Sequence, residues 1–341
     1  SIIKNYTLNN AAILAQSGAP LSSVSIIETS PDYLRSPTSL NFSALQSSII
    51  TNADKGLSNL IIESGARVNA DTRGEIILTS DNSLLVNGLL AAPSGSIELD
   101  IIAPTYDGRD LGFLADQYIW LDSTARLDVS GAVVSQPSQV SVDFPDEVSV
   151  LDAGSVSINA DRGYVITQAG SVIDLSGTSS TSLQSNGIRF DEVPLFGNAG
   201  QLDIETGSGL VLNATLLADA ANPKASNGGL NILLDRRAFI NQIDLIAGGR
   251  LAPDTPRIFE LSNSFTDTGI SQGQPVDDAF HGKAFVNLSD IQSSGFDKVN
   301  LSLNVGNRSA GTSLIRFNEG ISLSARQSIY LNSPVVDLQD N

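Results

Sequence analysis

The 341-residue chain contains no cysteine and no methionine, and its only histidine is His281. Without cysteine, a disulfide-stapled fold and thiolate metal sites are excluded, and one histidine excludes the usual zinc ligand sets. The lack of both oxidisable sulfur side chains fits a protein exposed outside the cell. Because the chain starts at Ser1 without methionine and carries no signal peptide, we expect a processed or excised piece.

Aromatic and basic residues are also scarce. Aromatics make up 6% of the chain, and 19 Lys and Arg stand against 37 Asp and Glu, for a net charge of −18. The core must therefore be aliphatic, and the acidic surface repels nucleic acid phosphates and anionic membranes. No apolar run approaches the ~18 residues of a spanning helix. We expect no nucleic acid partner and no membrane insertion.

What is abundant points to short strands and tight turns. The chain is 41% hydrophobic, mostly Val, Ile, Leu and Ala, and its 29 glycines are mixed with many Ser, Asn and Asp residues. This combination is typical of β-strands joined by turns. The sequence predicts an all-β protein.

Internal repeats narrow the fold. Three blocks of fourteen residues align without gaps: 75–88 (EIILTSDNSLLVNG), 118–131 (YIWLDSTARLDVSG) and 164–177 (YVITQAGSVIDLSG). The alignment puts Ile77, Trp120 and Ile166 in one phase, which we interpret as inward. Trp120 is therefore expected to pack in the core rather than to stack on a sugar.

A second motif, Gly-x-apolar-x-apolar, recurs between the blocks at Gly95, Gly154, Gly200 and Gly228. The spacings add up to a repeat of about 30 residues with three strands. Strands this short bury their apolar faces only when successive repeats stack, which predicts a right-handed parallel β-helix, a solenoid with loop insertions. A jelly roll or a sandwich is the alternative, but it predicts hairpins without a fixed repeat.

The regularity of the pattern divides the chain. We predict a lead-in or capping region at 1–58, coils at 59–249 with insertions at 103–115, 133–150 and 178–198, an irregular excursion at 250–298, and resumed β-helix strands at 299–341. Three prolines and few alternating runs distinguish the excursion.

The motifs resemble those of filamentous haemagglutinin-like exoproteins, the cargo of two-partner secretion in Gram-negative bacteria. The resemblance rests on ARLDVSG (125–131), GSVIDLSG (170–177), GSVSI, GQLDI, and the series SGFDKVNLSL, IRFNEGISLSA and SIYL between Ser294 and Leu331. It implies a β-helical shaft, an outer-membrane transporter for export, and adhesive, biofilm or contact-dependent roles. The family's amino-terminal secretion signatures and a carboxy-terminal toxin module are not evident, so the resemblance implies an interior shaft segment.

Acidic residues are the first candidates for chemistry, since β-helical polysaccharide enzymes place carboxylates on neighbouring coils. Asp128, Asp174 and Asp244 occupy similar points of the strand motif. Alternation turns Asp128 away from Leu127, so these acids form a ladder on an outer face. We interpret the ladder as a solvated surface that discourages aggregation, and predict no catalytic residue.

The insertions and the excursion hold the candidate binding residues. They are Asp143, Asp146, Glu147, Asp152, Asp277, Asp278 and His281. Calcium is conceivable at the acidic loop, but the spacing of an EF-hand and the nonapeptides of calcium-loaded β-rolls are missing, so we predict no cofactor and no metal site. His281 is expected to be an ordinary surface residue.

These observations favour a non-enzymatic structural or adhesive shaft segment of a large secreted protein at the bacterial cell surface. Its partners would be a polysaccharide or the surface of a host or neighbouring cell, which it would contact in attachment, biofilm or cell–cell contact. The alternatives are a β-helical polysaccharide lyase or glycoside hydrolase, and an extracellular filament subunit that associates end to end through open coil edges.

Overall fold

The computed structural model describes residues 36–45, 58–102, 105–106, 109–138, 145–236, 245–264, 268–305, 311–318 and 320–338. The chain divides into two units, 1–36 and 37–341, and every described residue except Ser36 belongs to the second. Among the described residues, no helix is long and apolar enough to cross a bilayer.

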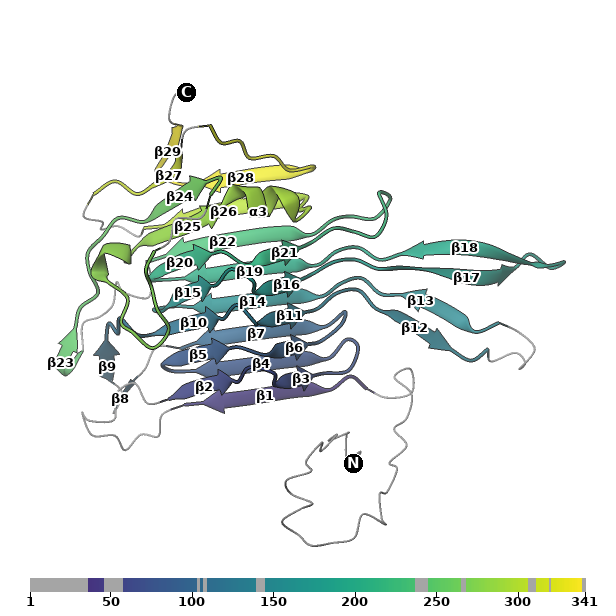
Figure 1. Cartoon of the computed structure of the whole chain (residues 1–341), viewed down its shortest axis with the longest axis horizontal. Helices are drawn as coiled ribbons and strands as arrows, with labels where there is room; N and C mark the ends of the chain where they lie inside the picture. The colour runs from purple at the N-terminus through teal and green to yellow at the C-terminus, as the bar shows by residue number, and fades with distance from the viewer. Residues whose placement is uncertain are drawn as a thin grey trace, which may run out of the picture. The chain divides into compact units, whose positions relative to one another are not determined.

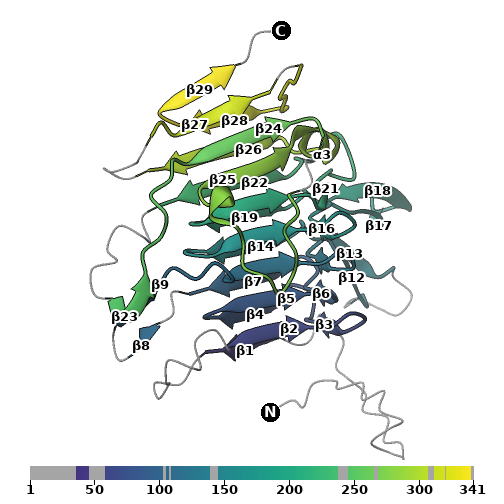
Figure 2. The ribbon, with the colours of Figure 1, turned by 60° about the vertical axis from the view of Figure 1, so that its left-hand side comes forward.

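Three parallel sheets run along the stack (Figures 1 and 2). The first sheet is formed, in spatial order, by β1 (Ser39–Ala44), β4 (Glu75–Ser80), β7 (Ser96–Ile101), β14 (Ser155–Ala160), β19 (Gln201–Thr206), β22 (Gly229–Asp235), β26 (Lys298–Asn304) and β28 (Ser328–Asn332). The second is formed by β2 (Asn59–Ile62), β5 (Ser83–Val86), β10 (Tyr118–Leu121), β15 (Tyr164–Thr167), β20 (Gly209–Leu212), β25 (Lys283–Asn287), β24 (Ile258–Ser262), β27 (Leu314–Phe317) and β29 (Val335–Leu338). The third is formed by β21 (Thr215–Leu217), β16 (Val172–Asp174), β11 (Arg126–Asp128), β6 (Leu89–Ala91) and β3 (Arg67–Asn69).

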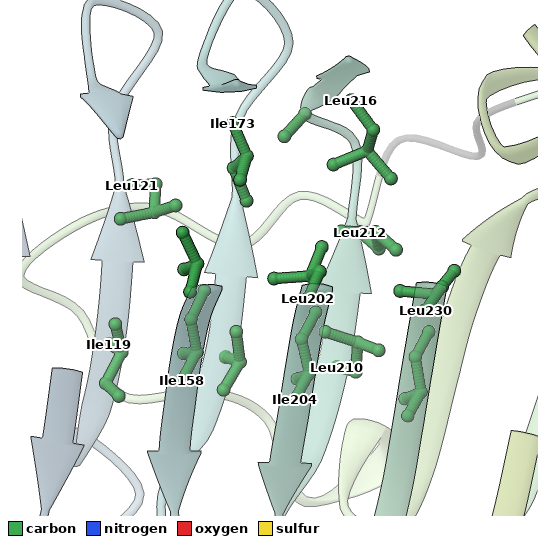
Figure 3. Packing of buried hydrophobic residues seen from close by; sticks show 14 of the residues in the cluster. Ile119, Leu121, Ile158, Ile173, Leu202, Ile204, Leu210, Leu212, Leu216 and Leu230 are labelled. Carbon is green, nitrogen blue, oxygen red and sulfur yellow. The ribbon is translucent and has the colours of Figure 1, made fainter. Parts of the chain in front are cut away.

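The core lies between the sheets and is built from columns of equivalent side chains. One inward column of the first sheet consists of Leu40, Ile76, Ile97, Val156, Leu202, Leu230, Val299 and Ile329. Strands ~4.8 Å apart place each side chain on the one below, so apolar area is buried continuously along the stack. Figure 3 shows Ile158 and Ile204 of this sheet in the same core as Ile119 and Leu210 of the second.

The predicted fold class, an all-β parallel β-helix with loop insertions, is confirmed by this arrangement. The alternation of the strands explains this stacking: inward positions of β14 and β19 are buried, and the outward positions between them carry Ser, Asn, Gln, Asp or Glu at intermediate exposure. Such a strand is stable only when both edges are paired, and stacking supplies both partners.

The block alignment was wrong in one respect. Block 75–88 spans β4 and β5, whereas 118–131 spans β10 and β11, so the first block is offset by one strand of the coil. The residue that pairs with Trp120 in β5 is Leu85, not Ile77. Successive strands of one coil show the same alternation of apolar and polar residues. A fourteen-residue alignment therefore cannot tell which strand of the coil it begins with.

Segment 250–298, which we expected to be irregular, contributes two strands and a helix. β24 and β25 pair in reverse order: β25 inserts between β20 and β24, and β27 pairs with the far edge of β24. The helix α3 (Leu288–Ser293) follows β25, buries Leu288 and Ile291, and lies near β21. The strands are short and follow prolines, so their alternation is hard to detect in the sequence.

Hairpins and small sheets occupy the ranges expected to be insertions. β12 (Val133–Gln136) pairs antiparallel with β13 (Glu147–Val150), and β17 (Ser179–Ser185) pairs antiparallel with β18 (Phe190–Phe196). Both hairpins extend away from the three sheets (Figure 1). In range 103–115, β8 (Thr105–Tyr106) pairs with β9 (Arg109–Gly112), which also pairs with β23 (Leu245–Arg250). Within 1–58, β1 is already a rung of the first sheet.

The core columns predict a sharp contrast between two neighbouring residues of β14. Ile158 is fully buried in the cluster, whereas Ser157 faces outward. We expect Ile158→Ala to lower the free energy of unfolding by about 3 kcal/mol through lost burial and the cavity left behind. Ser157→Ala, the control, should change it by less than about 0.5 kcal/mol. Urea unfolding followed by circular dichroism measures both, and equal effects would contradict the inward assignment.

Candidate functional site

The acids of the predicted ladder hold corners of the coil. The Asp128 Oδ1 accepts hydrogen bonds from the Ser130 amide at 3.1 Å and its hydroxyl at 2.7 Å. The Asp174 Oδ1 accepts the same pair from Ser176, at 3.1 and 2.6 Å. Arg126 links the two rungs, with its Nη2 2.7 Å from the Asp174 Oδ2 and its Nε 3.7 Å from the Asp128 Oδ2. The third acid, Asp244, lies outside the described residues.

These contacts give the carboxylates a structural task. Each one satisfies a backbone amide where a strand ends, which is the usual role of Asp in an Asx turn. Arg126 neutralises charges that lie one rung apart, since Asp128 and Asp174 are paired neighbours. Solvated acids were expected at these positions, but Asp174 is 7% exposed.

The predicted acidic loop residues separate in the structure. Asp143 lies outside the described residues, and Asp146, in the β12–β13 hairpin, accepts from the Ser135 hydroxyl at 3.3 Å. Glu147 is exposed on β13. Asp152 binds Asn198 instead, accepting from its amide at 2.7 Å and its side-chain nitrogen at 3.1 Å. Asp152 thereby anchors the corner beside the second hairpin.

His281 is buried, so the expectation of a surface residue was wrong. It is 1% exposed, its Nδ1 lies 2.9 Å from the Thr255 hydroxyl, and its ring meets Phe113 edge-on with centroids 5.1 Å apart. Burial, and then the charges of Arg257, Arg236 and Arg250, lower its pKa to about 3. The imidazole is therefore neutral near pH 7 and does not serve as a proton-exchanging base there.

The two acids near His281 serve local structure. Asp277 is the N-cap of η2 (Asp278–Phe280) and accepts from the Ala279 amide at 2.8 Å. Asp278 forms an ion pair with Arg250. Over the described ranges, no three His, Asp or Glu side chains come together in a group that could hold a metal ion.

The outer face of the first sheet forms a shallow polar groove of about 710 Å³ across β14, β19, β22, β26 and β28. Its lining side chains include Ser157, Asn159, Asp203, Glu205, Asn231 and Asn300. The Asn231 Nδ2 donates to the Asp203 Oδ1 at 2.6 Å, across one rung. The groove therefore presents rows of amide, hydroxyl and carboxylate groups with the period of the strands.

Beside this groove, β7 carries two outward carboxyl groups, Glu98 and Asp100, two residues apart. Burial, a hydrogen bond and repulsion from Glu98, and repulsion from Asp161 raise the pKa of Asp100 to about 7, and a hydrogen bond with Asn159 opposes the shift. The two acids of β7 and the two acids of β19, Asp203 and Glu205, therefore lie on strands that flank β14.

An aromatic row covers part of the outer face of the second sheet. Tyr118 and Tyr164 occupy one outward column of β10 and β15, and Trp120 and Phe285 occupy the other, with Ile166 and Val211 between them. The prediction that Trp120 points into the main core was wrong: it is 3% exposed, but in a separate cluster outside the sheet. Ile77, Trp120 and Ile166 do share a phase, but that phase faces outward, and because both faces of β10 are buried and apolar its alternation does not reveal which face is inward.

The cover over this row is the strap, defined here as residues 268–282 of the connection from β24 to β25. Its Val276 is buried in the aromatic cluster, and Ile270 and Phe280 pack against it. The Gly273 amide donates to the Tyr118 Oη at 2.6 Å, and the Val276 amide to the Ala115 carbonyl at 2.8 Å. The sequence did not predict this site. Its residues are few and come from four separate strands and a loop, so no local motif brings them together.

Comparisons with protein-family models, with curated proteins and with solved structures each find no match.

Removal of a corner carboxylate should be costly. Asp174→Ala removes the acceptor of the Ser176 amide and hydroxyl and the nearer of the two carboxylates that pair with Arg126, so we expect the free energy of unfolding to fall by about 2 kcal/mol. Asp146→Ala, at an exposed hairpin position, is the control and should cost less than about 0.5 kcal/mol. Chemical unfolding compares them, and an unchanged midpoint for Asp174→Ala would refute the structural role.

The raised pKa of Asp100 predicts a pH dependence of stability. Its folded pKa, about 7, lies above its ordinary value of 3.8, so between these values the native state binds more protons than the unfolded chain. Stability therefore falls as pH rises from about 4 to about 7. Asp100→Asn should flatten this part of the profile, as measured by thermal unfolding from pH 4 to pH 8. Parallel profiles for the two proteins would contradict the assignment.

Proposed function

We propose that the chain is a non-enzymatic shaft segment of a secreted bacterial surface protein, similar to the filamentous haemagglutinin-like exoproteins, and that it attaches to polysaccharide. The observation that carries the proposal is the polar groove on the first sheet, which repeats the same kinds of side chain from β14 to β28. A repeating surface of this kind suits a repeating ligand.

The side chains of the groove favour a sugar polymer. Asn and Ser supply hydrogen-bond donors and acceptors to hydroxyl groups, and the rungs recur every ~4.8 Å along the stack. Asp203 and Glu205 add negative charge. The groove therefore suits neutral or cationic polysaccharides better than sulfated or uronic acid polymers, which it repels.

The proposal places the protein at the bacterial cell surface, exported through an outer-membrane transporter. Parallel coils without disulfides can form progressively as a chain emerges, because each rung needs only the rung before it. End-to-end association into a filament remains a further proposal. It is supported by the outer edges of β1 and β28, which pair with no other described strand and where Phe42 is 43% and Ile329 is 41% exposed.

A second candidate, polysaccharide hydrolysis, is favoured by Asp100. A carboxyl group with a pKa of about 7 is suited to donate a proton. The acids of β19 lie two rungs away, roughly 10 Å by strand spacing, near the ~6.5–9.5 Å separation of inverting glycosidases. The corner contacts of Asp128 and Asp174 argue against a role for those acids.

One experiment separates the two candidates. Binding to a polysaccharide array is measured together with release of reducing sugar, for the wild type and for Asn231→Ala/Asn300→Ala. The groove variant should bind at least about tenfold more weakly, the effect of losing two hydrogen-bonding side chains. Asn69→Ala/Gln184→Ala, at exposed positions on β3 and β17, is the matched control and should bind as the wild type does.

Two results would overturn the shaft proposal. If the groove variant bound polysaccharide as strongly as the wild type, the groove would not be the binding site. Sugar release by the wild type that Asp100→Asn abolishes would establish the hydrolase instead.

A further inference from the structure

Aromatic side chains are concentrated at one place. Six of the chain's 19 aromatic residues belong to the aromatic cluster outside the second sheet: Phe113, Tyr118, Trp120, Tyr164, Phe280 and Phe285. The main core is built almost wholly from aliphatic side chains. A chain that uses so few aromatic rings places nearly a third of them on an outer face, where a parallel β-helix does not need them to stack its coils.

Two of these rings hold hydrogen-bonding groups that the strap does not satisfy. The Trp120 Nε1 and the Tyr164 Oη are buried and have no hydrogen-bond partner in the described part of the chain. Both residues are at most 3% exposed. Buried Trp and Tyr almost always find a partner. The row therefore offers two hydrogen-bond donors, and the strap supplies no acceptor for either.

The strap is weakly attached. Nine of its 15 residues are exposed, and Val276 is the one apolar side chain of the strap buried in the aromatic cluster. Its end is anchored by His281, which is 1% exposed and contacts Thr255 and Phe113. Ahead of that anchor, Ile270 and Phe280 pack against the cluster, and the amides of Gly273 and Val276 and the ion pair of Asp278 with Arg250 tie the strap down. The stretch 268–280, in which nine residues are exposed, therefore opens at a lower free energy than the strands beneath it, with His281 as its fixed end.

The fit between strap and row is also imperfect. A cavity of about 10 Å³ remains among Tyr164, Ile270, Phe280 and Phe285. Gly209 widens this place, because a Cβ there would lie 2.8 Å from the Lys283 carbonyl oxygen and 3.1 Å from the Tyr164 ring. The strap covers the row without filling the space in front of Tyr164.

We propose that the strap is a lid, and that the row of Tyr118, Trp120, Tyr164 and Phe285 binds the ring faces of a sugar polymer when the strap lifts. Tyr and Trp rings stack on the apolar faces of sugars, while the Trp120 N–H and the Tyr164 O–H donate to sugar oxygens. Phe285 lies three rungs from Trp120, which matches an extended ligand along the stack. The proposal rests on the proposed function for its ligand class but uses a different face.

Trp120 is the only tryptophan in the chain and reports directly on the lid. Val276→Asp places a charge in the buried anchor of the strap and should release it, with a red shift of the Trp120 emission. Gln274→Asp, at an exposed strap position, adds the same charge and should leave the emission unchanged. Asp278→Ala removes the ion pair with Arg250 and should loosen the strap less strongly. It replaces Val276→Asp in the experiment if circular dichroism shows that Val276→Asp does not fold.

Binding is measured by affinity gel electrophoresis in dextran and in hydroxyethyl cellulose. The released variant should be retarded more than the wild type, and Trp120→Ala in the same background should weaken the interaction by about tenfold or more, as for loss of an aromatic anchor. Asn231→Ala/Asn300→Ala in that background should keep the gain, because the groove lies on the first sheet.

Each remaining outcome is decisive. A red shift without increased retardation would show that the strap covers a packing surface and overturn the binding site. Unchanged emission in both released variants would overturn the lid. Loss of the gain with the groove variant alone would assign the binding to the groove and leave the proposed function standing without this site.

Discussion

The structure depends on registered stacking of parallel strands. Each inward side chain of the first sheet lies on an equivalent side chain of the next rung, so a column tolerates few changes of size. The corners are equally constrained: a Cβ at Gly154 would lie 1.7 Å from the Gly95 carbonyl oxygen, and one at Gly200 would lie 2.0 Å from that of Gly154. Because side chains inside and glycines at this corner are fixed by their neighbours, substitutions are tolerated best at outward positions and in the insertions.

This constraint explains why the acids that attract attention in the sequence are structural. A coil that turns three times leaves backbone amides at its corners, and Asp128, Asp174 and Asp152 accept hydrogen bonds from such amides. Because the same corner recurs in successive coils, an aspartate recurs with it, and Arg126 neutralises the charges of Asp128 and Asp174. A regular series of carboxylates thus follows from the geometry of the coil, whereas Asp100, which departs from this role, has a perturbed pKa.

Period-two alternation and glycine spacing were sufficient to predict the fold, since they reflect local sequence. Features that depend on register were not predictable. Trp120 faces away from the main core, which its neighbours Ile119 and Leu121 enter, and the apolar residues on both faces of β10 hide this direction in the sequence. The reversed order of β24 and β25 is a matter of tertiary pairing. The burial of His281 depends in turn on the strap, which precedes β25 and comes from a connection that no alternation marks.

The connection between β24 and β25 links the fold to the aromatic row. β24 and β25 both belong to the second sheet and no described strand of another sheet lies between them, so the chain passes from one to the other by way of the strap over the outer face of that sheet. A cover that served only to bury apolar surface would be expected to pack aliphatic side chains against aliphatic ones, as the main core does. Instead the strap covers rings whose Trp120 N–H and Tyr164 O–H stay without acceptors among the described residues. Burial of unpaired donors costs free energy, so this arrangement is better explained by a surface whose polar groups are satisfied when the cover is displaced.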